Sequence, residues 1–98
     1  MEIEFVEPAS IELDDAIQYY NLQASKLGDK FLDEVISATK LIARFPNTWK
    51  RNTTHTRCAL LKKFPYNLIY TIFREKIYII AVAHQHRKPE YWIDRILK

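Results

Sequence analysis

The residues of this sequence best suited to chemistry lie together near its C-terminal end. His84, His86 and Arg87 directly follow an apolar run at residues 77–83, and Tyr91 comes four residues later. Histidine titrates near neutral pH, so the imidazoles could serve as acid and base, while arginine pairs with phosphate oxygens. Residues i and i+2 of an extended strand share a face, so both imidazoles could reach one phosphate. Alternatively, they are polar residues that bond to the backbone and the tail.

A second group of residues at this end is better suited to binding than to catalysis. Arg87, Lys88 and Arg95 could form a basic rim that grips an anionic partner, or they could be solvated or paired with nearby carboxylates. Tyr91 and Trp92 could stack on a base, fill an interface pocket, or dock a terminal helix onto the core. We expect a target-binding surface of Arg87, Tyr91, Trp92 and Arg95, which we call the basic C-terminal face, and no role for Lys88.

Metal and cofactor chemistry is not expected. His84-x-His86, with a distant His55 and the single cysteine Cys58, does not make a full ligand set. One cysteine forms no intramolecular disulfide, which is typical of a reducing compartment. The start of the chain has no basic and apolar signal, and no apolar run has membrane-spanning length. We therefore expect a cytoplasmic protein without a cofactor.

Charge is divided unevenly along the chain. Residues 1–50 carry five Lys and Arg against nine Asp and Glu, whereas residues 51–98 carry ten against three. A basic half favours an anionic partner, either nucleic acid or an acidic protein segment. The alternative is that the two halves neutralise each other in the fold.

Several stretches have the patterns of strands. Residues 2–7 alternate polar and apolar side chains, as in a half-buried strand. Residues 77–83 are rich in β-branched and aromatic side chains, as in a central strand buried on both faces. Residues 68–73 form another such run, and the polar segment 74–76 predicts a hairpin between the two. A further strand around Leu60 precedes this hairpin.

Two helices are expected between the first strand and the others. Apolar residues recur at helical spacing from about Ala9 to Ala24, and again over residues 31–45. Pro46 ends the second helix, because the residue before a proline is disfavoured in the helical region. Gly28 is the only glycine, and we expect it to adopt the left-handed conformation that stops the first helix. So short a connection makes the helices an antiparallel hairpin.

These elements define an α+β class with a single domain over residues 1–98. The expected order is an N-terminal strand, the helical hairpin, a three-stranded antiparallel meander forming one sheet, and a short C-terminal helix at residues 89–97. Residues 47–56 are polar and are expected to form a loop. We expect the second strand to run antiparallel to the first.

Three segments resemble one family: residues 27–35, LGDKFLDEV, residues 61–70, LKKFPYNLIY, and residues 80–92, IAVAHQHRKPEYW. They are similar to the helical turn, the hairpin, and the final strand and tail of the RelE/ParE superfamily of bacterial type II toxin–antitoxin toxins, often labelled plasmid stabilisation proteins. The resemblance implies the fold above and a toxin held inactive by a cognate antitoxin, as a hetero-oligomer.

The superfamily divides by target. RelE-like members are messenger RNA endonucleases that act on the ribosome, whereas ParE-like members are described as inhibitors of DNA gyrase. The nucleases place basic residues on the strand before the hairpin, where this sequence has Cys58 and Leu60, and an arginine after the turn aromatic, where it has Asn67. Arg87 matches a basic position of the nucleases, and Tyr91 could stand near their C-terminal tyrosine. The resemblance favours the ParE-like branch.

The favoured function is therefore growth inhibition by binding gyrase through the basic C-terminal face, with an antitoxin that wraps an apolar and acidic segment over this surface. The first alternative is a metal-independent RNA endonuclease that uses His84, His86, Arg87 and Tyr91, since such cleavage needs a base, an acid and cations for the phosphate. The second alternative, supported by the charge asymmetry, is a non-toxic nucleic-acid-binding module.

Overall fold

The apolar run at residues 77–83 forms an interior strand of the sheet. A computed structural model describes residues 1–96 and gives a five-stranded sheet in the order β1-β5-β4-β3-β2. The strands are β1 (Glu2–Phe5), β2 (Lys50–Arg51), β3 (Arg57–Leu60), β4 (Tyr66–Phe73) and β5 (Lys76–His84). Because β5 lies between β1 and β4, its backbone is paired on both sides along the first half of the strand. The prediction of a central strand is confirmed.

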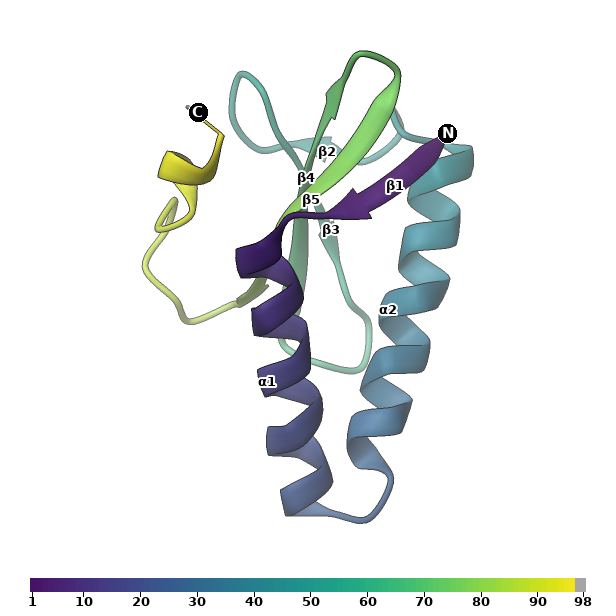
Figure 1. Ribbon diagram of the computed structural model, residues 1–98, viewed down its shortest axis with the longest axis vertical. Helices are drawn as coiled ribbons and strands as arrows, with labels where there is room; N and C mark the ends of the chain where they lie inside the picture. Colours follow the sequence, from purple (N-terminus) through teal and green to yellow (C-terminus); the bar gives the residue numbers. More distant parts are fainter. Residues whose placement is uncertain (97–98) are drawn as a thin grey trace.

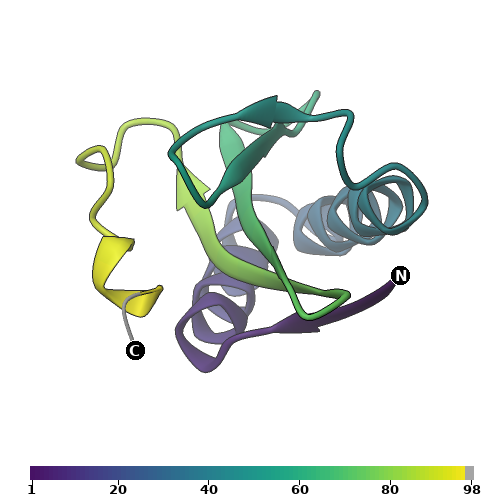
Figure 2. The ribbon, with the colours of Figure 1, turned by 90° about the horizontal axis from the view of Figure 1, so that it is seen from above.

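Helices α1 (Glu7–Gln23) and α2 (Leu27–Arg44) form the expected antiparallel hairpin and cover one face of the sheet (Figure 1). The C-terminal tail crosses the opposite face, as the view from above shows (Figure 2). The tail contains one 3-10 turn, η1 (Ile93–Arg95), which is shorter than the helix expected over residues 89–97. The last part of that expectation, Leu97, lies outside the described residues.

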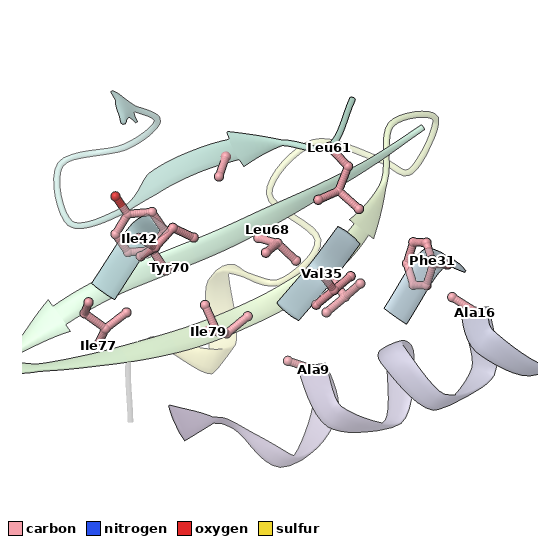
Figure 3. Packing of buried hydrophobic residues seen from close by; sticks show 12 residues of the cluster. Ala9, Ala16, Phe31, Val35, Ile42, Leu61, Leu68, Tyr70, Ile77 and Ile79 are labelled. Atoms are coloured by element: carbon pink, nitrogen blue, oxygen red, sulfur yellow. The ribbon is translucent and has the colours of Figure 1, made fainter. Parts of the chain in front are cut away.

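Side chains of α2 and of the central strands build the main core. Phe31, Val35 and Ile42 from α2 pack against the sheet residues Tyr70 and Ile79 (Figure 3). On the other face a smaller cluster is built from Ile69, Ile80, Ala81, Ala83 and Trp92. Cover on both faces explains why residues 77–83 are apolar without alternation.

The α+β class, the helical hairpin and the antiparallel β3-β4-β5 meander are confirmed, but the direction of one strand is not. β1 pairs with β5 in parallel, so β3 runs in the same direction as β1. The difference follows from where α2 ends. The Met1 amino group donates a hydrogen bond to the Ala43 carbonyl, 3.2 Å away, so α2 ends beside the beginning of β1 and not beside its end. The region expected to be a loop, residues 47–56, also contains the short strand β2.

Gly28 has a different role from the one predicted. The left-handed residue between the helices is Lys26, with φ of 64°, and Gly28 lies inside α2 with its Cα against α1. A Cβ atom at this position would lie 2.1 Å from the Ile17 carbonyl oxygen. The Gly28 N–H also donates to the Asn21 side chain at 2.7 Å, which satisfies one of the free donors at the start of a helix. Glycine is needed here for close helix packing.

Candidate functional site

The candidate residues gather where β5 ends and β4 begins. His84 is the last residue of β5 and is paired with Tyr66, whose ring it meets edge-on at a centroid distance of 5.1 Å. His84 and Arg87 line a cavity of about 210 Å³ on the side of the tail and another of about 280 Å³ on the side of α1. The end of the strand therefore presents polar side chains to both faces of the sheet.

The two imidazoles lie side by side, but not for the predicted reason. The strand ends at His84, and His86 belongs to the following turn, so the two are not neighbours on one strand face. Their ring centroids are 5.2 Å apart, and the backbone N–H of His86 donates to Nδ1 of His84 at 3.1 Å. Nδ1 is thereby the acceptor, so neutral His84 carries its proton on Nε2. This arrangement suits His84 as a hydrogen-bond donor.

Tyr91 lies between two arginines. The guanidinium carbon of Arg87 lies 3.9 Å from the centroid of the Tyr91 ring, and that of Arg95 lies 5.2 Å from it. Both distances are within the range of a cation–π interaction. Arg87 is exposed, so its stack on Tyr91 presents a positioned cation to solvent.

Glu12 of α1 holds this arrangement together, and no role in the site was predicted for it from the sequence. Its carboxylate accepts hydrogen bonds from the Val82 N–H at 3.0 Å, the Tyr91 hydroxyl at 2.5 Å, and Arg95 at 2.9 and 3.0 Å. Arg95 also donates to the Ile80 carbonyl at 2.9 Å. β1 pairs with β5 only as far as Ile79. Beyond it, Glu12 accepts from the Val82 N–H and Arg95 donates to the Ile80 carbonyl, so the ion pair provides the hydrogen bonds that a neighbouring strand would otherwise make.

The sequence signal for Glu12 is weak, because Asp14 and Asp15 stand beside it and look equivalent. Only the direction of α1 relative to the edge of β5 distinguishes the three acidic residues. The Glu12 hydrogen bond raises the pKa of the Arg95 guanidinium above its ordinary value, and the side chain of Arg95 is only 21% exposed. Arg95 therefore anchors the tail.

Trp92 also anchors the tail. It is 3% exposed and packs with Ile69, Ile80 and Ala83 on the face opposite the helices. This position favours the docking interpretation of Trp92 over direct contact with a target.

Ion pairs connect the acidic and basic halves of the chain. In the part of the chain that the structure describes, Lys76 pairs with Glu2 and Glu4, and Arg95 pairs with Glu12. Each pair joins a carboxylate of the first half to a cation of the second. Part of the charge asymmetry is thus neutralised within the fold, while Arg87 stays exposed.

Two of the residues that the resemblance aligns with basic positions of the RelE-like nucleases line the same cavity as His84 and Arg87. Cys58 and Asn67 are both in its wall, and burial raises the pKa of the Cys58 thiol, which keeps it neutral. The third such residue, Leu60, is 62% exposed on β3. The strand therefore supplies no cation to this cavity. Among residues 1–96, no three His, Cys, Asp or Glu side chains are grouped to hold a metal ion.

The chain matches the family described as the ParE toxin of type II toxin-antitoxin system, parDE, over residues 3–89. The chain belongs to this family. The match includes His84, His86 and Arg87, whereas Tyr91 and the anchoring residues Trp92 and Arg95 follow it.

A solved structure supports the fold of this ParE-family toxin. The structure of this chain is similar to that of a chain of the chromosomal ParDE toxin–antitoxin system from P. aeruginosa, with a TM-score of 0.77 and 16% sequence identity. The match covers 86% of this chain and 95% of that chain. No curated protein shows significant similarity to the sequence. No helix within residues 1–96 is long and apolar enough to cross a membrane.

Titration of Tyr91 gives a prediction for this toxin at high pH. Burial first, and then the hydrogen bond to Glu12, raise the pKa of the Tyr91 phenol above its ordinary value of 10.0. A raised pKa in the folded state stabilises the protein below pH 10, and this contribution is lost as the pH rises above 10. In urea unfolding between pH 8 and pH 11, Tyr91→Phe should lose less stability than wild type over the alkaline part of the range.

The control for this experiment is Tyr19→Phe, which removes a phenol that is 55% exposed on α1. Its stability should follow the wild-type curve. Equal alkaline losses in Tyr91→Phe and wild type would contradict the assignment.

Proposed function

We propose that this toxin inhibits growth in the cytoplasm by binding DNA gyrase, and that Arg87 makes the central contact. The observation that carries the proposal is the exposed Arg87 guanidinium stacked 3.9 Å from the Tyr91 ring centroid. Tyr91 is in turn held by Glu12. An arginine positioned in this way loses little conformational entropy when it pairs with a carboxylate or phosphate on a partner. In this proposal Trp92 and Arg95 position the face, and Arg87 and Tyr91 contact the target.

The RNA endonuclease remains the rival proposal, because His84 and His86 are adjacent and Arg87 lies beside them. Against it stands the composition of the cavity wall, where Cys58 and Asn67 occupy positions that would need cations to hold a phosphate. With Arg87 and Lys88 as the cations of that cavity, stabilisation of a cleaved phosphodiester would depend on few charges.

We further propose that a cognate antitoxin neutralises the toxin by placing an apolar and acidic segment in a groove between α2 and β3, and not over the basic C-terminal face as the sequence led us to expect. This groove has a volume of about 760 Å³, and its apolar lining includes Leu41, Leu60 and Phe64. Its charged lining is mixed, with Lys30, Lys62 and Lys63 beside Asp33 and Glu34, and the Glu34 carboxylate already accepts from the backbone N–H groups of Lys62 and Lys63. Apolar side chains would occupy the groove, and acidic ones would meet the lysines. Co-expression with the antitoxin should restore growth to cells that express the toxin.

A paired assay tests the target. Purified toxin should inhibit gyrase supercoiling, and Arg87→Ala should weaken that inhibition by roughly tenfold to a hundredfold, as expected for the loss of one or two charge-assisted hydrogen bonds. Lys88→Ala, which removes the same charge one residue away, should inhibit like wild type.

The same proteins are added to a translation extract, where the proposal expects intact transcripts. Transcript cleavage that disappears in His84→Ala would overturn the gyrase proposal in favour of the endonuclease. Absence of both activities, in a protein that binds nucleic acid without stopping growth, would favour the non-toxic module.

A further inference from the structure

A second group of basic residues lies at the other end of the sheet. Arg51 of β2 and Arg57 of β3 are direct cross-strand partners, so their side chains leave the sheet on the same face. The pair is close to Thr71 of β4, which is five residues after Tyr66 and therefore roughly 17 Å along the strand from the His84 site. These arginines took no part in the proposed function.

Each of the two guanidiniums is held by the backbone. Arg51 donates through one Nη to the Thr54 carbonyl at 2.9 Å, and Arg57 donates in the same way to the Trp49 carbonyl at 2.7 Å. A guanidinium has five N–H donors, so these contacts orient the two groups and leave donors for a ligand. Such oriented donors bind an anion with little further loss of side-chain freedom.

No carboxylate compensates the two positive charges. Within residues 1–96, neither Arg51 nor Arg57 has an Asp or Glu oxygen within 4.0 Å, in contrast to Arg95 with Glu12. Like charges directly opposite each other in a sheet are destabilising. An anion between them would remove that repulsion.

The two arginines open onto a polar pocket. Its volume is about 210 Å³, several times the roughly 30 Å³ share of one water molecule in the liquid. The remaining wall includes Asn47 and His55, which offer amide and imidazole groups, and Thr71, whose hydroxyl donates to the His55 carbonyl at 2.6 Å; no acidic residue lines the pocket. Neutral donors beside two guanidiniums are suited to a tetrahedral oxyanion.

We propose that this pocket, which we call the Arg51–Arg57 pocket, binds a phosphate group. The two guanidiniums neutralise the charge by bidentate pairing with the phosphate oxygens, which arginine geometry favours. The phosphate belongs to one of two sources. It is part of a small molecule (free phosphate or a nucleotide), or it is part of the backbone of a polynucleotide. The proposal is independent of the toxin's target, because the pocket and the His84 site do not share residues.

Nuclear magnetic resonance titration of the full chain tests the proposal. Inorganic phosphate, a nucleoside diphosphate and a short single-stranded oligonucleotide are each added at constant ionic strength, with chloride as the reference anion. Phosphate should shift the amide and arginine side-chain resonances around residues 51–57 and leave those around His84 unchanged. Arg51→Gln and Arg57→Gln should each weaken binding at least about tenfold.

Lys40→Gln is the matched control, since it removes one positive charge from an exposed position of α2 and should bind like wild type. Arg51 is exposed, so its substitution tests the site even if Arg57→Gln disturbs the β2-β3 hairpin.

The three ligands distinguish the sources. Much tighter, salt-dependent binding of the oligonucleotide indicates a polynucleotide backbone, and similar affinities indicate a small phosphate. No shifts beyond those of chloride with any ligand, or equal binding by wild type and Arg51→Gln, would overturn the proposal.

Discussion

Gly28→Ala is expected to destabilise the protein by about 3 kcal/mol, because the added Cβ overpacks the contact between α1 and α2. That Cβ would lie 2.1 Å from the Ile17 carbonyl oxygen and 2.7 Å from Cγ of Asn21. The first of these atoms is backbone and cannot rotate away, so the helices must separate. Separation would also lengthen the hydrogen bond from the Gly28 N–H to Asn21, now 2.7 Å. Thermal unfolding should occur roughly 10–20 °C lower.

The sign of this effect is diagnostic. Within an unobstructed helix, alanine is more favourable than glycine by up to about 1 kcal/mol, so a loose helical hairpin would make Gly28→Ala neutral or stabilising. Ser37→Ala, on an exposed position of the same helix, should change stability by no more than about 0.5 kcal/mol. A Gly28→Ala protein as stable as wild type would show that α1 and α2 do not pack at this distance.

Glu12→Gln is expected to destabilise the protein by about 2–3 kcal/mol, somewhat less than the loss of one partner of a fully buried ion pair. The carboxylate accepts from Val82, Tyr91 and Arg95 together, and its side chain is 17% exposed. Glutamine keeps the shape but leaves the Arg95 charge without its partner and turns one acceptor into a donor. Urea unfolding measures the loss of stability.

A second measurement separates the anchoring role of Glu12 from a general loss of stability. If the ion pair fixes the tail, hydrogen exchange in Glu12→Gln should increase first at Val82 and in residues 91–96, before the helices are affected. Asp14→Asn, an exposed carboxylate of the same helix, should leave both exchange and stability near the wild-type values. Uniform acceleration of exchange across all elements would contradict a local anchor.

Local patterns were sufficient to predict most of the elements. The helical hairpin, the β4-β5 hairpin and the central position of residues 77–83 all follow from periodicity and from short connections, which are properties of neighbouring residues. The turn of the β4-β5 hairpin uses Arg74 and Glu75, both with positive φ, without a glycine. The hairpin was nevertheless predictable, because only a few polar residues separate the two apolar runs, and so short a connection joins antiparallel neighbours.

Other features depend on contacts between residues far apart in the chain, and these were missed. The parallel pairing of β1 with β5 depends on where α2 returns, which no local pattern specifies. Gly28 looked like a turn residue because the distance between the helices is not visible in one dimension. Glu12 contacts residues 70 to 83 positions away, so its carboxylate could not be distinguished from its acidic neighbours.

For the site, the sequence alone determined which side chains stand at the end of the buried strand: His84, His86 and Arg87, with Tyr91 close behind. Only the tertiary structure decided how they are used, because α1 brings Glu12 to the unpaired edge of β5 and draws Arg95 and Tyr91 onto it. Arg95 and Trp92 then hold the tail, and Arg87 is left exposed on the Tyr91 ring. Residue types and order are local information, whereas the pairing of a carboxylate with a guanidinium at the other end of the chain exists only once the helix and the sheet have packed.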